Sequence, residues 1–209
     1  MMKATSIILA GGLNKRLGRN KALLVINGQT MIERVINRLV PLTDEFLVVT
    51  GSETPELPVS GQAEIVADLF PGSGPLGGIY SGLRASGTLL NIVVACDMPF
   101  LNIDLLEQML ALSPGFDAVV PRLENGMVEP LHAVYSSSCL GKMKELLENK
   151  QLGVAPFLEQ VSVRYIEPVE SRKTDPELLS FFNINFPADY ERAKDLAARD
   201  ADTRDLNNA

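Results

Sequence analysis

Cysteine and histidine are scarce in this chain of 209 residues, which contains two cysteines and one histidine. Cys96 and Cys139 lie far apart and form no C-x-x-C pair, so a disulfide framework and a cysteine zinc site are both disfavoured. The single histidine, His132, excludes a metal site built from several histidines. These counts favour a reducing compartment, and we expect a cytoplasmic protein.

Long apolar runs, a basic excess and low-complexity segments are also lacking. No run approaches the roughly 20 apolar residues that a membrane-spanning helix needs. The formal net charge is -7, whereas proteins that bind nucleic acids or anionic membranes are usually basic. We therefore expect no nucleic acid and no membrane as partners. The few residues before Thr5 also predict that the chain has no secretory signal.

Short apolar runs alternate with amphipathic stretches in the first half of the chain. Strands are expected at 5–9, 46–50, 63–67 and 91–95. Thr30 and Glu33 form a capping-box pattern that predicts a helix from Met31 to about Pro41. Further helices are expected around Ile79 and from about Asn102. This order predicts a Rossmann-like, three-layer α/β fold with a mostly parallel sheet and helices on both faces.

The second half changes character. Residues 117–121 and 131–135 are expected strands that flank a turn-like segment at 124–126, which predicts a small antiparallel ribbon. Two helices (138–150 and 153–160) and two strands (161–166 and 181–185) are expected to follow. Pro187 suits the first turn of a terminal helix. We expect one domain, residues 1–198, and a polar, frayed tail, residues 199–209.

The opening loop is the first candidate site. An apolar run ends in Gly11 and Gly12, and a loop with several basic residues follows. Glycines permit close ligand approach, and successive unpaired N–H groups after a buried strand bind anions. In an acidic protein, the cations Lys15, Arg16, Arg19 and Lys21 favour a polyphosphate ligand. The alternative is a plain turn with a solvated basic loop. The spacing fits neither a Walker A loop nor the Rossmann fingerprint.

Two carboxylates follow expected strands. Asp97 comes soon after the strand 91–95, and Asp68 directly after 63–67. The carboxyl ends of parallel strands meet at one edge of a sheet, and Mg²⁺ prefers one or two carboxylates with substrate phosphates. Asp97 is therefore a candidate metal ligand, with a turn or helix cap as the alternative. Asp68 is a candidate contact for a metal, nucleobase or ribose, with a surface turn as the alternative.

A different class of function is suggested by a literal G-x-G-x-x-G at Gly72, Gly74 and Gly77. Asp97 lies twenty residues after the last glycine, as a nicotinamide-binding oxidoreductase requires. Against this hypothesis, residues 68–71 separate the motif from its strand, and Pro75 removes an N–H group. The simpler interpretation is a glycine-rich loop that lets a helix approach a ligand.

Each of three polar residues in the second half has both a functional and a structural interpretation. Asn183 and Asn185 alternate with apolar residues in the expected strand 181–185, so both amides would face one side. They would bind a polar heterocycle there, or cap the next helix. His132 lies between Leu131 and Ala133, which favours a core position over a catalytic base.

Together these segments resemble the molybdenum cofactor guanylyltransferases, a family of nucleotide-diphospho-sugar transferase-like enzymes. The loop 9–21 resembles the signature loop of that superfamily. Four further segments resemble motifs of the family itself. They are PGSGPLGG (71–78) after Asp68, CDMP (96–99), PLHA (130–133) and NINFP (183–187). The chain departs at Asn20, where the family usually has Asp, and at Phe186, where it usually has Thr.

The resemblance implies that GMP is transferred from GTP to molybdopterin, with Mg²⁺ as the cofactor and pyrophosphate as the product. It implies nucleotide contacts by Leu9, Ala10, Gly11, Gly12, Lys21, Asp68 and Asp97, of which Asp97 also binds the metal. It implies acceptor contacts by Asn183 and Asn185. We expect Asp97, Lys21 and Arg16 to be catalytic by positioning and charge neutralisation, because an attacking phosphate needs no dedicated base.

Two matters stay open. A related nucleotidyltransferase that uses CTP, or another phosphorylated acceptor, would share the loop and Asp97. We also expect a monomer that contacts proteins delivering or accepting molybdopterin only transiently.

Overall fold

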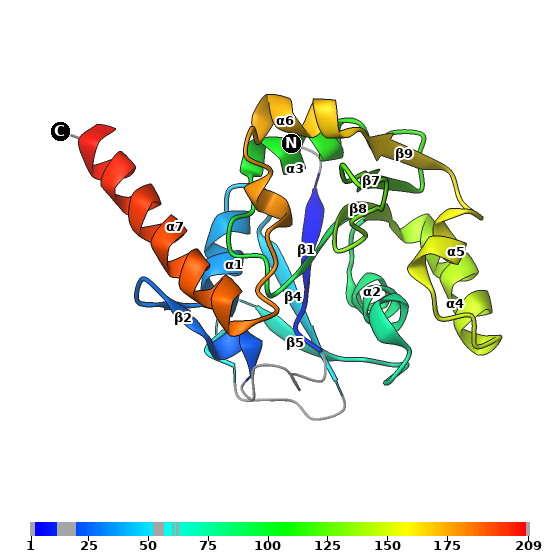
Figure 1. The fold of residues 1–209 in the computed structure, drawn as a ribbon. Coiled ribbons are helices and arrows are strands. Elements are labelled where there is room, and N and C mark those ends of the chain that lie inside the picture. Colours follow the sequence, from blue (N-terminus) through cyan, green and yellow to red (C-terminus); the bar gives the residue numbers. More distant parts are fainter. Residues whose placement is uncertain (1–2, 12–19, 52–56, 60, 62, 208–209) are drawn as a thin grey trace.

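The computed structural model describes residues 3–11, 20–51, 57–59, 61 and 63–207. Its centre is a seven-stranded sheet in the order β5-β4-β1-β6-β8-β7-β9 (Figure 1). The strands are β1 (Ala4–Leu9), β4 (Glu45–Thr50), β5 (Glu64–Ala67), β6 (Leu90–Ala95), β7 (Ala118–Pro121), β8 (His132–Ser136) and β9 (Val163–Ile166). All four strands predicted in the first half are confirmed.

The sheet is mostly parallel, as predicted. β1 pairs in parallel with β4 and β6, and β4 pairs in parallel with β5. β8 runs antiparallel to both of its neighbours, β6 and β7, while β7 and β9 are parallel. The predicted antiparallel ribbon is therefore confirmed as β7 and β8, which are also part of the main sheet. Every residue of β1 and β6 is buried, which explains their continuous apolar runs.

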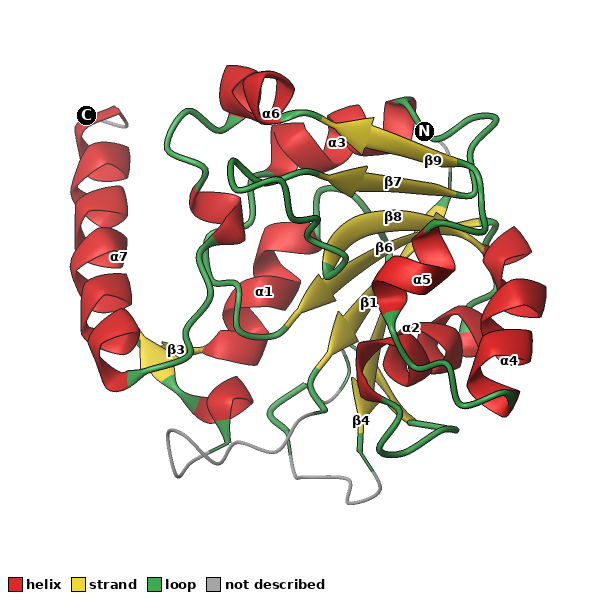
Figure 2. Cartoon of the chain, turned by 45° about the vertical axis from the view of Figure 1, so that its right-hand side comes forward, coloured by secondary structure: helices red, strands yellow, loops and turns green. Residues whose placement is uncertain are grey.

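Helices cover both faces of the sheet (Figure 2). Side chains from α1 (Met31–Leu39) and α3 (Ile103–Ala111) pack on one face. Side chains from α2 (Gly74–Ala85), α4 (Leu140–Glu148) and α5 (Val154–Leu158) pack on the other. The three-layer prediction is confirmed. So is the capping box of α1, in which Glu33 Oε2 accepts from Thr30 N at 2.8 Å and Thr30 Oγ1 from Glu33 N at 3.4 Å.

A small satellite packs beside the main sheet. Strands β2 (Val25–Ile26) and β3 (Gln29–Thr30) form a two-stranded antiparallel hairpin. Its turn residues Asn27 and Gly28 both have positive φ, as a tight hairpin turn requires. Helix α7 (Pro187–Asn207) lies against this hairpin (Figure 1). Ile184, just before the helix, is fully buried in the same apolar cluster.

Two elements differ from the sequence-based expectations. The helix α6 (Pro168–Thr174) was not predicted, although Pro168 at its first turn and a Glu167–Glu170 capping box stabilise its start. The predicted strand 181–185 is wrong: a 3₁₀ turn, η3 (Leu179–Phe181), is followed by irregular backbone. Phe182 and Ile184 alternate with the two asparagines because both pack on the satellite, although their backbone is irregular, and Phe181 packs on the sheet's core.

The polar segment that was expected to fray includes the last part of α7, which continues to Asn207. In the described part of the chain, no helix combines the length and the apolar character needed to cross a bilayer.

Candidate active site

The carboxyl ends of neighbouring strands bring the candidate residues of the first half to one edge of the sheet. Backbone hydrogen bonds continue past the strands: Ala10 N donates to Val49 O at 2.8 Å, and Cys96 N donates to Leu9 O at 3.1 Å. Asp68 N donates to Thr50 O at 2.9 Å. The predicted convergence at this edge is confirmed for the described residues. Gly12 and Arg16, together with the rest of 12–19, lie outside the described residues.

Lys21 is the centre of the polar cluster at this edge. Its Nζ donates to Asp97 Oδ2 at 2.8 Å and to Asn185 Oδ1 at 2.8 Å. The side chains of Lys21 and Asp97 are only 17% and 19% exposed, so water screens this pair less than a surface ion pair. Residues that are distant in sequence thus form one site, with an amide and a carboxylate oxygen on one ammonium group.

The position of Lys21 is set by the residue before it. Asn20 is the N-cap of the short 3₁₀ helix η1 (Lys21–Leu23), and its Oδ1 accepts from Ala22 N at 3.1 Å. An Asp at this position, usual in the resembling family, would also offer an oxygen to that N–H. The departure at Asn20 therefore keeps the cap and removes one negative charge beside Lys21.

Asn185 is held by backbone contacts rather than by a strand. Ile184 N donates to Asp97 O at 3.1 Å. Asp189 Oδ2 accepts from Asn185 N at 2.9 Å and from Phe186 N at 2.8 Å. This carboxylate in the first turn of α7 satisfies N–H groups at the helix start. The start of α7 thereby fixes the amide of Asn185 against Lys21.

Glu129 is a site residue that the sequence reasoning missed. Its Oε1 accepts from Leu131 N at 3.2 Å, and Leu131 O accepts from Ala95 N at 3.0 Å at the end of β6. Burial raises the pKa of Glu129 and the charge of Asp97 raises it further, while the backbone N–H of Leu131 and the amide of Asn183 lower it. An acidic residue at the entry to the buried strand β8 was the signal that would have found it.

Asp68 reaches the same edge but forms bonds within its own turn. Its Oδ1 accepts from Phe70 N at 3.0 Å and from Ser81 Oγ at 2.9 Å. Ser81 Oγ in turn accepts from Leu69 N at 2.9 Å. Gly77 faces this turn, because a Cβ atom there would lie 2.9 Å from Phe70 O. The structure therefore confirms a turn at Asp68 and shows why α2 needs a glycine beside it.

The glycine motif of the rival hypothesis has an unsuitable setting. β5 ends at Ala67 and α2 begins only at Gly74, whereas the dinucleotide fingerprint needs a tight strand-to-helix turn. Gly72 and Gly74 have positive φ values of 84° and 65°, so they shape the connection between the two elements.

His132 and Cys96 are core residues. Neither ring nitrogen of His132 has a hydrogen-bond partner in the described structure, and the ring packs edge-on against Phe181, 5.2 Å between centroids. Burial lowers the pKa of His132 to about 4. Burial and the neighbouring Asp97 raise the pKa of Cys96 to about 12, so the thiol stays protonated at neutral pH. His132 lies in the core, as predicted.

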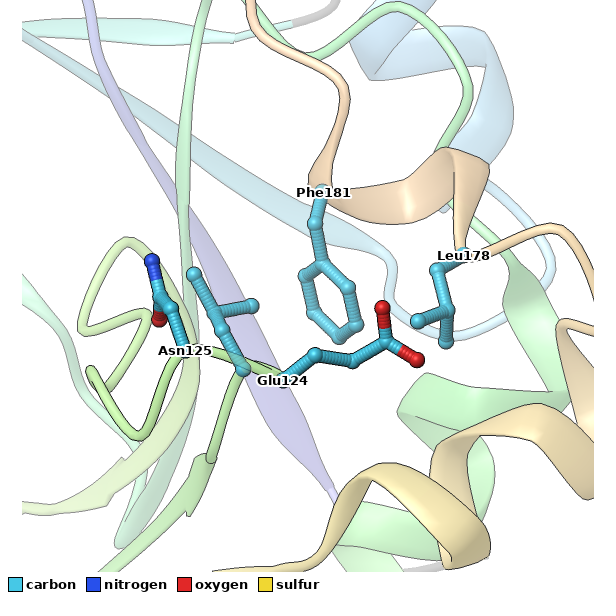
Figure 3. A pocket seen from close by; sticks show the side chains of 5 residues that line it. Glu124, Asn125, Leu178 and Phe181 are labelled. Atoms are coloured by element: carbon cyan, nitrogen blue, oxygen red, sulfur yellow. The ribbon is translucent and has the colours of Figure 1, made fainter.

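A cavity of about 340 Å³ opens next to the second-half residues (Figure 3). It is lined by Leu123, Glu124, Asn125, Leu178 and Phe181. The ring of Phe181 points toward the side chain of Glu124, whose carboxylate lies between this ring and Leu178 in this view (Figure 3). The cavity thus lies between the tip of the β7–β8 hairpin and the segment that leads to Asn183.

The described residues suit a hard cation with few protein ligands. They contain no cluster of three or more His, Cys, Asp or Glu side chains that would hold a metal by itself. Asp97 Oδ2 and Asn185 Oδ1 both lie on the ammonium group of Lys21, so two oxygen atoms already converge on a positive charge. Mg²⁺ fits such a site, because it keeps several waters and takes its other ligands from substrate phosphates.

Comparisons with known proteins agree with this geometry. Residues 6–164 match the family model described as the MobA-like NTP transferase domain. The probable molybdenum cofactor guanylyltransferase of Pelotomaculum thermopropionicum is 36% identical over 197 residues, covering 94% of this chain and 95% of that protein.

Solved structures give the same result. Molybdopterin-guanine dinucleotide biosynthesis protein A from Archaeoglobus fulgidus superposes with a TM-score of 0.81 and 31% identity, covering 93% of this chain and 99% of that one. The 2-C-methyl-D-erythritol 4-phosphate cytidylyltransferase of Thermus thermophilus, at 22% identity and a TM-score of 0.69, covers 94% of this chain and 100% of its own. This second likeness concerns the fold alone. The chain belongs to the molybdenum cofactor guanylyltransferases, a family of MobA-like nucleotidyltransferases.

Proposed function

We propose that this protein transfers GMP from GTP to molybdopterin and releases pyrophosphate. The observation that carries the proposal is the bridge from Lys21 to both Asp97 and Asn185. It places one cation and two oxygen ligands where the nucleotide side and the second half of the chain meet. Phosphoryl and nucleotidyl transfer depend on such positioning and charge neutralisation more than on acid–base groups.

In the proposed reaction, an oxygen of the acceptor's terminal phosphate attacks the α-phosphorus of GTP. The new P–O bond forms as the bond between the α-phosphorus and the bridging oxygen breaks, and pyrophosphate leaves with the bonding electrons. The attacking phosphate is already ionised, so no proton must be removed. Lys21 neutralises negative charge that builds up on the triphosphate, an effect that is strong in a partly desolvated site.

Mg²⁺ belongs to the same proposal, with Asp97 as its protein ligand and the oxygen of Asn185 close by. Bound there, the ion would neutralise phosphate charge and favour departure of pyrophosphate. Asn185 was expected on the acceptor side alone. Its bond to Lys21 supports a place at the reacting phosphates.

The nucleotide is proposed to lie along the ends of β1 and β5. Leu9, Ala10 and Gly11 supply the backbone there, and the predicted roles of Gly12 and Arg16 stay part of the proposal. Asp68 would act on the guanosine through the turn that it organises with Ser81. Asn183 is proposed to contact the acceptor, and its amide lowers the pKa of Glu129. A monomer in the cytoplasm, in transient contact with molybdopterin-delivering proteins, completes the proposal.

The function is tested by incubating the protein with Mg²⁺, molybdopterin and α-labelled GTP or CTP. We expect label to enter a dinucleotide from GTP, and GTP to raise the melting temperature more than CTP does. Preferential transfer from CTP would support a cytidylyltransferase instead. Stabilisation by NAD(H) with no response to any triphosphate would contradict nucleotidyl transfer altogether.

Lys21→Ala tests the site within this assay. We expect turnover to fall by about 10²-fold, because a charge in contact with the reacting phosphates is lost. Lys142→Ala is the matched control, since Lys142 pairs with Glu145 on the surface of α4. Equal activity of the two variants would remove Lys21 from the catalytic group.

A further inference from the structure

Glu129 is a half-buried carboxylate whose role the function above leaves unassigned. It lies where the chain returns from the β7–β8 hairpin, and its backbone N donates to Pro121 O at 2.9 Å. One carboxylate oxygen accepts from Leu131 N. Among the residues that the structure describes, no lysine or arginine forms an ion pair with it. A partly buried charge of this kind calls for hydrogen-bond donors from another source.

The residues around Glu129 indicate what kind of ligand would supply hydrogen-bond donors to it. Glu129 lies beside the end of β6, because Ala95 N donates to Leu131 O at 3.0 Å, two residues along the chain from Glu129. The charge of Asp97 raises the pKa of its carboxyl group. The one described cation of the cluster, Lys21, is used by Asp97 and Asn185. A ligand that meets Glu129 therefore encounters hydrogen-bond acceptors in excess. It should present N–H donors and carry no negative charge at that point.

The order of the strands tells which substrate approaches this carboxylate. Asp97 follows β6, and the nucleotide is proposed to lie along β1 and β5, which lie on one side of β6. Glu129 precedes β8, on the opposite side of β6. Guanine and pterin share an edge with an amino group and a ring N–H next to a carbonyl. The topology assigns that edge, at Glu129, to the acceptor.

We propose that Glu129 recognises the pterin ring of the acceptor by accepting hydrogen bonds from its amino group and adjacent ring N–H. A carboxylate has two oxygens in a plane, so it accepts two parallel N–H bonds. The backbone N–H of Leu131 holds the carboxylate in position. The inference rests on the proposed function, because it names how the acceptor of that reaction is selected.

Glu129→Gln is the first test, since it keeps the shape and replaces one acceptor by a donor. We expect KM for molybdopterin to rise about 10- to 100-fold, the usual effect of losing hydrogen bonds to a charged group. KM for GTP and the Mg²⁺ concentration for half-maximal rate should stay unchanged. Glu148→Gln, at an exposed ion pair on α4, is the matched control and should change none of them.

Three other results of the Glu129→Gln kinetics would overturn the inference. An unchanged KM for molybdopterin would show that Glu129 does not contact the acceptor. A raised KM for GTP would place guanine, the other ring with this edge, at Glu129. A raised Mg²⁺ requirement would make Glu129 a metal ligand.

The second test uses the unmodified protein and therefore does not depend on a variant that folds. Pterin and lumazine differ because lumazine carries an oxygen in place of the amino group. We expect titration calorimetry to give at least 10-fold tighter binding of pterin, a preference that Glu129→Gln abolishes. Equal binding of the two rings, or no binding of pterin at millimolar concentration, would overturn the inference.

The two tests also separate this inference from the function on which it rests. A wild-type protein that prefers pterin but transfers no GMP would contradict the proposed function and leave recognition by Glu129 standing. A protein that transfers GMP normally but does not distinguish pterin from lumazine would support the proposed function and contradict recognition by Glu129.

Discussion

Asp97 and Asp68 follow strands β6 and β5, which end at the same edge of the sheet with β1 and β4 between them, yet the two carboxylates have different partners. Asp97 bonds to the ammonium group of Lys21, from another part of the chain. Asp68 bonds to Phe70 N and Ser81 Oγ, within its own turn and the helix that follows. A carboxylate after a buried strand is therefore a marker of the ligand edge, but its partners decide whether it is available to act on a ligand. We expect Asp97 to affect the rate of the reaction, and Asp68 to affect GTP binding through the shape of the turn that it organises.

The largest expected effect comes from Asp97→Asn compared with Asp68→Asn. The first should lower turnover by about 10²- to 10³-fold, because it removes charge from the reacting centre. The second should leave turnover within a few-fold and raise KM for GTP. Initial rates at varied GTP measure both, with melting temperatures to confirm folding. Equal losses of turnover would remove the distinction between the two carboxylates.

A pH-dependent effect should appear on the side of Asp97. His132 packs against Phe181, which precedes Asn183, and burial lowers its pKa to about 4. Below its ordinary pKa of about 6.5 the unfolded chain takes up a proton that the folded chain refuses. Stability should therefore fall between pH 6.5 and 4, by up to about 3 kcal/mol.

Urea unfolding of wild type and His132→Leu across this range isolates the contribution of the histidine. The variant stays neutral at every pH, so its stability should fall less steeply than that of wild type. Parallel pH profiles for the two proteins would show that folding does not lower the pKa of His132.

Gly77→Ala tests the side of Asp68. The added Cβ would lie 2.9 Å from Phe70 O and 3.3 Å from Asp68 Oδ1, so the turn must shift. We expect a loss of about 1–3 kcal/mol in the free energy of unfolding, as for other overpacked sites, and a raised KM for GTP. Gly141→Ala, in α4 with no atom within 4 Å of its Cβ, should be neutral or stabilising. A stable Gly77→Ala protein with normal KM would mean that the turn is irrelevant to GTP.

The smallest effect is expected for Ser81→Ala. The hydroxyl donates to Asp68 and accepts from Leu69 N, so its removal leaves Leu69 N without this acceptor and Asp68 Oδ1 with only the bond from Phe70 N. Denaturant unfolding should show a loss of about 1–2 kcal/mol, with turnover at saturating GTP unchanged. A drop in turnover comparable with that of Asp97→Asn would contradict a role confined to the turn.

The sequence predicted the first half of the molecule well, because buried parallel strands produce continuous apolar runs and capping residues mark helix starts. It also predicted that Asp97 and the opening loop meet. The strand predicted at 181–185 was wrong because Phe182 and Ile184 pack on the satellite from irregular backbone, which produces the same alternation in the sequence as a strand. Glu129 was missed because it reaches the site through the antiparallel pairing of β8 with β6, which only the folded chain shows.

The bond between Lys21 and Asn185 also has a consequence for how the protein is made. The matched family domain ends at residue 164, so Asn185 lies beyond the core that carries Lys21 and Asp97. Ribosomes deliver the N-terminal part first, and domains begin to fold as they emerge. The nascent chain can build its sheet before Asn185 is available to Lys21. We therefore expect the proposed reaction centre to be completed late in synthesis, when the segment leading into α7 has been added.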